Sequence, residues 1–339
     1  MDKGTQSSYP IMAKSIPYTP PADILASFPE KSGNDVNGVG ETEYRRASRF
    51  FWHKPDLQSH GQLQKTVLKY VMGEPSVGAE FIHAGPGDPK RGPVAVAQSE
   101  HVAEGSKDQW SEKIKAFALA NEADVVGIAK MRDAFIFDGY EVSHKYIIMI
   151  GVAHDYELMK TAPSTPENPS SAAEVARQYN RGSRVVSKLR NYILEQGYPA
   201  ADYPGPLADA IVMIPAAIDC GLGELGKHGS LINRKLGSSF RLAAVTTDMP
   251  LTVDAPDTFD VDDVCYGCRA CENACPPDAI FQEKKTVRGV EKWYVDFDKC
   301  IPFFAESYGC GACIAVCPWS IPGVADNLLL KMARRKARE

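Results

Sequence analysis

Eight of the nine cysteines in the chain lie between residues 265 and 317, at spacings that suit the thiolate ligands of iron–sulfur clusters. The first run is Cys265-Tyr-Gly-Cys268-Arg-Ala-Cys271-Glu-Asn-Ala-Cys275-Pro276, and the second is Cys300 followed by Cys310-Gly-Ala-Cys313-Ile-Ala-Val-Cys317-Pro318. In a C-x2-C-x2-C-x3-C-P run, three thiolates bind one cluster and the fourth binds the other. The spacing therefore predicts two [4Fe–4S] clusters, one held by Cys265, Cys268, Cys271 and Cys317, the other by Cys275, Cys300, Cys310 and Cys313.

The second run departs from the simple pattern, because nine residues separate Cys300 from Cys310 where two are usual. We expect this inserted loop, residues 301–309 with Phe303, Phe304 and Tyr308, to cover one cluster. Zinc and disulfides are the alternatives. Zinc usually takes two paired sets of ligands and does not need the crossover to a second site. Disulfides are less favoured, because clustered C-x2-C spacing without a secretory signature indicates metal binding.

Length and charge limit the classes of function. A chain of 339 residues can form one large domain with a small appended module. Its formal net charge of −5 gives no overall basic field, so DNA is not an expected partner. No run of eighteen apolar residues occurs, and we expect no transmembrane helix.

The segment Tyr44-Arg-Arg-Ala-Ser-Arg-Phe-Phe51 is similar to a twin-arginine export signal. However, Trp52-His-Lys-Pro-Asp56 follows where the signal would need an apolar stretch. We therefore expect a cytoplasmic location for the chain as written. The alternative is an exported, membrane-associated protein from which a signal has been removed, since that chain would have the same sequence.

Residues 1–105 form an irregular N-terminal region rich in Pro, Gly and Ser, with turns at residues 18–21 and 83–93 and one helix at residues 61–72. The aromatic residues Phe50, Phe51 and Trp52 indicate that this region packs on the rest of the protein.

A regular alternation of elements begins after residue 105. Apolar periodicity predicts helices over residues 108–121, capped by Asp108, and over residues 171–196, with a capping box at Ser171 and Glu174 and a stop at Gly197. A further helix is expected over residues 208–220. Buried strands are expected over residues 123–129, 145–152 and 240–247. The pattern indicates an α+β or α/β domain and leaves the strand order open.

A glycine-rich loop, Gly221-Leu-Gly-Glu-Leu-Gly-Lys-His-Gly229, follows the third helix. Gly221, Gly223 and Gly226 match the spacing of a dinucleotide-binding loop, but that fingerprint requires a preceding strand. We interpret the segment as a loop whose backbone lies close to a large flat ligand, because glycine removes Cβ from the contact. Helix-capping turns alone are the alternative. Cys220, beside the loop, is expected to be a buried packing residue.

The segment from Ile214-Pro-Ala-Ala-Ile-Asp through the glycine-rich loop to Thr247-Asp-Met-Pro-Leu251, followed by the two cysteine runs, resembles the corrinoid-dependent reductive dehalogenases. It is also similar to the related epoxyqueuosine reductases. The resemblance covers residues 108–320. It implies an α+β fold in which a nitroreductase-like α/β domain, residues 106–255, binds base-off cobalamin. A bacterial-ferredoxin-like domain with the two clusters, residues 256–322, and a basic tail, residues 323–339, would follow.

The resemblance also implies an activity, the replacement of halogen by hydrogen on an organohalide. Electrons would come from a low-potential donor such as a ferredoxin, a flavodoxin or a membrane-bound donor. The sequence carries no D-x-H-x-x-G signature for a lower histidine ligand, in agreement with a base-off cofactor. The predicted cobalamin-binding residues are those of the loop: Gly221, Leu222, Gly223, Glu224, Gly226, Lys227, His228 and Gly229.

By the family resemblance, Tyr179 corresponds to a tyrosine that would donate a proton to the substrate in the dehalogenases. Arg241 is its predicted partner. A nearby guanidinium stabilises a phenolate and so lowers the pKa of a tyrosine towards that of a working acid. An asparagine that some dehalogenases use near the substrate has no counterpart in residues 202–206.

Two alternatives remain open. The epoxyqueuosine reductases, which act on tRNA, have an aspartate acid in an Asp-Tyr-His context where this chain has Gln178-Tyr179-Asn180. The second alternative is a non-catalytic iron–sulfur protein that transfers electrons or activates the corrinoid of a partner.

Overall fold

A four-stranded antiparallel sheet forms the centre of the protein in the computed structural model, which describes residues 17–51, 59–81, 87–205 and 210–337. The strand order is β1-β2-β6-β3, with β1 at Val125–Lys130, β2 at Tyr146–Ala153, β3 at Ala200–Tyr203 and β6 at Phe240–Thr247. Strands β2 and β6 pair over their full length, from Tyr146 opposite Thr247 to Ala153 opposite Phe240. This pairing places the two most apolar strands at the middle of the sheet.

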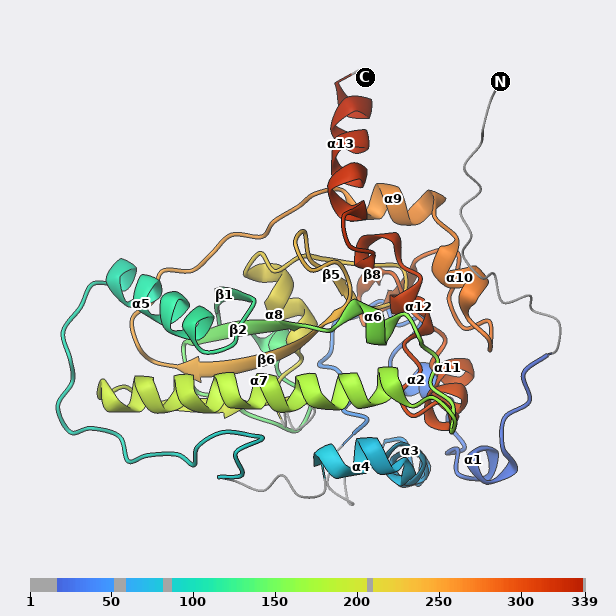
Figure 1. The fold of residues 1–339 in the computed structure, drawn as a ribbon, viewed down its shortest axis with the longest axis horizontal. Coiled ribbons are helices and arrows are strands. Elements are labelled where there is room, and N and C mark those ends of the chain that lie inside the picture. The colour runs from blue at the N-terminus through green and yellow to red at the C-terminus, as the bar shows by residue number, and fades with distance from the viewer. Residues whose placement is uncertain (1–16, 52–58, 82–86, 206–209, 338–339) are drawn as a thin grey trace.

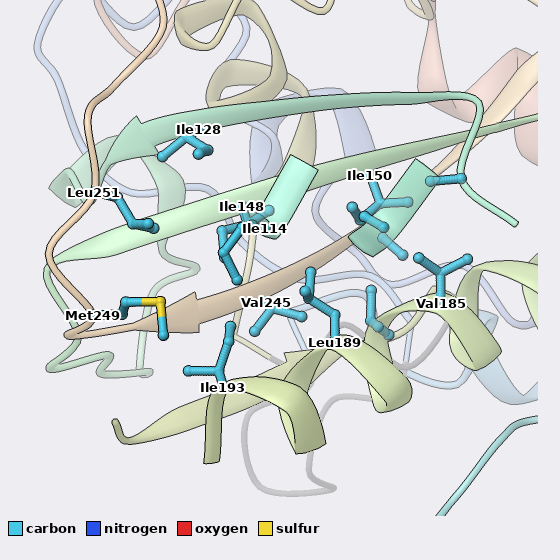
Figure 2. Packing of buried hydrophobic residues seen from close by; sticks show 14 of the residues in the cluster. Ile114, Ile128, Ile148, Ile150, Val185, Leu189, Ile193, Val245, Met249 and Leu251 are labelled. Atoms are coloured by element: carbon cyan, nitrogen blue, oxygen red, sulfur yellow. The ribbon is translucent and has the colours of Figure 1, made fainter. Parts of the chain in front are cut away.

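Both faces of the sheet are covered, which explains why β2 is a continuous apolar run. Helix α7, Ser170–Glu195, lies along one face together with α5, Lys107–Ala120 (Figure 1). Figure 2 shows Val185, Leu189 and Ile193 of α7 in the same cluster as Ile148 and Ile150 of β2. Side chains of a strand alternate between faces, so the intervening residues of β2 pack on the other side. There they meet α8, Met213–Asp219.

The cysteine-rich part follows the sheet domain and consists of short elements. They are α9 (Val261–Gly267), α10 (Ala270–Ala274), β7 (Lys285–Val287), β8 (Val290–Lys292), α11 (Phe297–Glu306) and α12 (Ala312–Ala315). Helix α13, Val324–Lys336, ends the described chain and projects away from the rest of the protein (Figure 1). A small hairpin, β4 (Glu224–Leu225) and β5 (Leu231–Ile232), connects the two parts.

The N-terminal region packs on the cysteine-rich part and on α7. Its helices are α1 (Ala22–Ala26), α2 (Gly33–Val36), α3 (Leu63–Gly73) and α4 (Pro75–Phe81). Ile24, Leu63 and Val67 form one buried cluster with Ile301 and Ala305 of α11. The region therefore has regular structure beyond the single expected helix. Trp52 and residues 82–86 of the expected turn lie outside the described residues.

Several expected boundaries are wrong. Ser106, not Asp108, caps α5, since its hydroxyl accepts from Gln109 N at 3.2 Å in a capping box. The capping box expected at Ser171 is absent, because its hydroxyl bonds the Ser164 hydroxyl at 2.7 Å within the described structure.

Further differences concern whole elements. Helix α8 begins at Met213, and the expected start at residue 208 lies outside the described residues. The loop expected at residues 301–309 is largely helix α11. Strand β3 is an element that the sequence pattern does not predict, whereas β6 has the expected bounds of residues 240–247. None of the described helices is both long and apolar enough to cross a membrane.

Replacing Ile148 by Ala tests the central core. The side chain is fully buried in β2 between the sheet and α7, so we expect a loss of about 2–5 kcal/mol in the free energy of unfolding. Leu119→Ala on α5, where the side chain is 51% exposed, is the control and should change stability by less than about 0.5 kcal/mol. Denaturant unfolding of both variants measures the difference, and equal effects would contradict the packing described above.

Candidate functional site

One cavity of about 890 Å³ has walls from the sheet domain, the N-terminal region and the cysteine-rich part. Helix α8 contributes the apolar residues Ile214, Pro215 and Ile218, and β6 contributes Arg241. The opposite side includes the β7–β8 hairpin and the segments that carry the second set of cysteines. A volume of this size is typical of a site for a large organic ligand.

Four of the cysteines, Cys275, Cys300, Cys310 and Cys313, line the cavity. They are the four that the spacing predicts as ligands of the second cluster. Burial raises the pKa of Cys300 to about 12, with Cys310 and Cys275 as the next contributors. Because a cluster binds thiolates, cluster binding in this set would release protons.

The other set lies in the same part of the chain, away from the cavity wall. Burial raises the pKa of Cys265 to about 12, the backbone N–H of Lys227 opposes the rise, and the thiols of Cys317 and Cys268 add to it. The pKa of Cys271 is raised to about 12 by burial and then by Cys317. Among the described residues, no three His, Cys, Asp or Glu side chains converge closely enough for a single metal ion. Metal analysis distinguishes the zinc alternative from the clusters.

The backbone around Cys310 has an unusual conformation. Tyr308, Gly309, Cys310 and Gly311 have φ values of +54°, +119°, +43° and +81°, all in the region that favours glycine. Burial raises the pKa of the Cys310 thiol, while the N–H groups of Ala312 and Gly311 and the Ser307 hydroxyl oppose the rise. The turn thus directs hydrogen-bond donors at a cysteine sulfur, which is where a thiolate ligand needs them.

The glycine-rich loop is held to the cysteine-rich part by two charged residues. The Lys227 ammonium donates to Glu272 Oε1 at 2.6 Å and to the Cys268 carbonyl at 3.4 Å. The Lys227 and Glu272 side chains are only 2% and 6% exposed. Glu224 accepts from the backbone N–H of Phe259 at 2.6 Å. These contacts fix the position of the loop at one side of the cavity.

Two glycines of the loop, Gly221 and Gly223, approach protein backbone. A Cβ on Gly223, at φ +142°, would lie 2.0 Å from the Ile232 carbonyl oxygen, and one on Gly221 would lie 2.5 Å from the Ala255 oxygen. The close approach is therefore to β5 and to residue 255, which corrects the interpretation of these two glycines as a ligand surface. Of the eight predicted cobalamin-binding residues, Glu224, His228 and Gly229 line the cavity. The other five, Gly221, Leu222, Gly223, Gly226 and Lys227, do not line this cavity.

Tyr179 and Arg241, far apart in the sequence, lie together in the structure. One guanidinium nitrogen of Arg241 is 3.5 Å from the Tyr179 hydroxyl, and the guanidinium carbon is 5.2 Å from the centre of the Tyr179 ring. Arg241 lines the cavity. Gly205 passes against the Tyr179 ring, where an added Cβ would be 2.7 Å from a ring carbon. Tyr179 itself is not among the residues that line the cavity, so its phenol is linked to the cavity wall through Arg241.

His154, which the sequence did not single out, orients Arg241. Arg241 Nε donates to His154 Nε2 at 3.1 Å, so this nitrogen is unprotonated and Nδ1 faces the Ser239 hydroxyl at 3.2 Å as the donor. Burial, followed by the charge of Arg241, holds the pKa of His154 well below its usual value. The imidazole is therefore neutral and accepts this hydrogen bond throughout the neutral pH range.

Comparison with known proteins relates the chain to iron–sulfur proteins and to reductive dehalogenases. Residues 264–321 match the family described as the 4Fe-4S dicluster domain. A tetrachloroethene reductive dehalogenase of Desulfitobacterium hafniense is 35% identical over 189 residues, which are 52% of this chain and 33% of that protein. That of Sulfurospirillum multivorans is 32% identical over 183 residues, 51% of this chain and 35% of that protein. The chain is a relative of the reductive dehalogenases.

More distant relatives extend the comparison. The epoxyqueuosine reductase of Escherichia coli is 30% identical over 180 residues, 46% of this chain and 44% of that protein. A solved reductive dehalogenase, described as B12-dependent, superposes on 90% of this chain and 46% of its own with a TM-score of 0.68 and 22% identity. The expected α+β fold with an appended dicluster module is confirmed. The match to the tetrachloroethene reductive dehalogenase of D. hafniense spans about a third of that protein's length.

Replacing Cys310 by Ser tests the assignment of the cysteines. The chain reconstituted with iron and sulfide should contain about eight iron atoms, and the variant about four, because only the second cluster loses a ligand. Cys220→Ala is the control, since Cys220 is 3% exposed in the core of the sheet domain and lies outside both sets. Iron analysis after desalting provides the measurement. Retention of all the iron by the Cys310→Ser variant would contradict the assignment.

Proposed function

We propose that this chain binds a corrinoid in the cavity and two [4Fe–4S] clusters in the cysteine-rich part, and that it reductively dehalogenates an organohalide. The observation that supports this most strongly is that a single cavity is lined by both Arg241 and the four cysteines of the second set. A cofactor in that cavity would contact an electron source on one side and a group that assists proton transfer on the other. The similarity to reductive dehalogenases supports the same activity.

The residues present fit a corrinoid. Ile214, Pro215 and Ile218 offer an apolar wall to a large ring, and Gly229 allows the backbone to approach it. When bound, the corrinoid supplies a reducible cobalt at which the carbon–halogen bond is cleaved, with electrons delivered through the clusters. The proposal includes the base-off state, since the sequence lacks a lower-ligand histidine signature.

Tyr179 is the proposed proton donor to the substrate carbon. Its hydroxyl is within 3.5 Å of Arg241, whose positive charge stabilises the phenolate left after proton transfer. His154 acts as a positioning residue, because it accepts a hydrogen bond from Nε of Arg241 and leaves another nitrogen of the same guanidinium facing the phenol. Overall, R–X, two electrons and one proton give R–H and halide. The electrons come from an external low-potential donor, such as a ferredoxin, a flavodoxin or a membrane-bound donor.

The epoxyqueuosine reductase alternative has less support from this chain. Its relatives here match at lower identity than the dehalogenases do. Tyr179 stands between Gln178 and Asn180, so the aspartate acid expected of that activity is missing at this place. Conversion of epoxyqueuosine-containing tRNA by the reconstituted chain would support that alternative.

Metal content with halide release tests the proposed function. Protein reconstituted anaerobically with iron, sulfide and cobalamin, then desalted, should retain about eight iron atoms and one cobalt per chain. With reduced viologen it should release halide from a halogenated substrate. Retention of iron without cobalt would overturn the dehalogenase mechanism and support an electron-transfer role, because the clusters would then stand alone.

Replacing Tyr179 by Phe tests the proton donor. Halide release should fall by about 100-fold or more, since a positioned general acid is lost, while iron and cobalt content should not change. Tyr192→Phe is the matched control on the same helix, because its ring stacks on Phe117 at 4.5 Å in the core cluster. Full turnover by the Tyr179→Phe variant would contradict the assignment of Tyr179.

A further inference from the structure

Lys292 is a cation on the cavity wall that has no protein partner among the described residues. It ends strand β8 and lines the cavity. Its ammonium makes no side-chain hydrogen bond or ion pair within the described parts of the chain. Burial lowers the pKa of Lys292 to about 8, and the charge of Arg288 contributes next. A partly desolvated ammonium without a counter-charge is unfavourable unless a ligand supplies one.

Two further cations, Arg288 and Arg45, line the same cavity as Lys292. Arg288, in the turn between β7 and β8, lines the same cavity, and one of its guanidinium nitrogens donates to the Asn37 carbonyl. Burial and then the charge of Arg45 lower the pKa of Arg288. Arg45 is bound by Glu41, whose two carboxylate oxygens lie 2.6 and 3.1 Å from its nitrogens. The Glu41 carboxylate is therefore engaged by Arg45, and no carboxylate in the described part of the chain contributes to the pKa shift of Lys292.

The acidic side chains that line the cavity do not neutralise the positive charge of Lys292 and Arg288. Asp262 is ion-paired with Lys284 and also accepts from the Trp293 indole at 2.6 Å. Glu291 is exposed, and its charge acts on Lys284. Glu224, which also lines the cavity, accepts from the backbone N–H groups of Phe259 and Val261. The wall at Lys292 and Arg288 therefore carries excess positive charge inside a cavity.

We propose that Lys292, together with Arg288, binds a phosphate group of the ligand that occupies this cavity. An ammonium and a guanidinium that line one cavity, the charge of the guanidinium lowering the pKa of the ammonium, suit the two free oxygens of a phosphodiester. This inference rests on the proposed function for the source of the phosphate, the nucleotide tail of the corrinoid. The peripheral side chains of cobalamin are amides, so the tail phosphodiester is its anionic peripheral group. A tail whose base does not bind cobalt needs another point of attachment.

Corrinoids with and without the tail test the proposal. The chain, loaded anaerobically with its clusters, is titrated with cobalamin and with cobinamide, which lacks the phosphate and the nucleotide, and binding is followed by absorbance. Lys292→Gln should weaken cobalamin binding by about tenfold or more, the effect of losing a charged hydrogen bond. Cobinamide binding should change by less than about twofold. Lys292→Arg should restore most of the preference for cobalamin.

Lys285→Gln is the matched control. Lys285 lies directly opposite Lys292 in the β7–β8 register, does not line the cavity, and has its ammonium 4.7 Å from the Phe281 ring centre. This control variant should bind both corrinoids as the unaltered chain does. The proposal would be overturned if the unaltered chain and the Lys292→Gln variant bound cobalamin with equal affinity. It would also be overturned if the variant lost affinity for cobalamin and for cobinamide by the same factor.

Titration with inorganic phosphate tests the anion site independently of the proposed function. If the unaltered chain binds neither corrinoid, the proposed function fails. Calorimetric titration with phosphate then shows whether Lys292 still forms part of an anion site. Phosphate binding that Lys292→Gln removes and Lys285→Gln retains would support an anion site with another source of phosphate, and no binding would overturn it.

Discussion

The buried ion pair between Lys227 and Glu272 joins the two halves of the protein, and the cavity depends on it. Lys227 belongs to the glycine-rich loop of the sheet domain and Glu272 to helix α10, between two cysteines. Glu272 also accepts from Arg269 Nε at 3.1 Å. Removing Glu272 would leave the buried Lys227 ammonium without a counter-charge in the described structure, which costs far more than an exposed pair is worth. The Trp293 ring, 4.9 Å from the Lys227 ammonium, adds to the contact. The pair therefore sets where the cysteine-rich part stands relative to Arg241.

The register of β2 against β6 has a similar role at the other side of the cavity. Val152 lies opposite Arg241, and His154 follows two residues later at the end of β2. A slip of one residue would turn Arg241 to the other face of the sheet. Helix α7 is continuous for 26 residues and packs its C-terminal half on the sheet. The core thus holds Tyr179 and Arg241 in one place, although each comes from a different element.

The sequence allowed the dicluster module, strand β6 and helix α7 to be predicted, because spacing and periodicity are local properties. Tyr179 and Arg241 were identified through the family resemblance, and the structure puts them in contact. His154 and Lys292 could not be found in this way, since a single histidine or lysine has no pattern, and their roles arise from tertiary neighbours. In the glycine-rich loop, by contrast, the sequence pattern suggested a ligand contact where the structure shows a contact within the protein. Gly223 and Gly221 pass close to the backbone at Ile232 and Ala255, and sequence alone does not distinguish this reason for a glycine from contact with a ligand.

The packing of the N-terminal region on α11 has a consequence for how the protein is made. Asn34 donates to Asp296 at 2.9 Å and accepts from Phe297 N at 2.8 Å, across more than 250 residues of chain. Contacts of such separation close a very long loop and form late in folding. Since α11 also carries Cys300, the segment around Asn34 cannot dock until this later, cysteine-bearing helix has been synthesised. During that interval the cysteine-rich part is uncovered on this side.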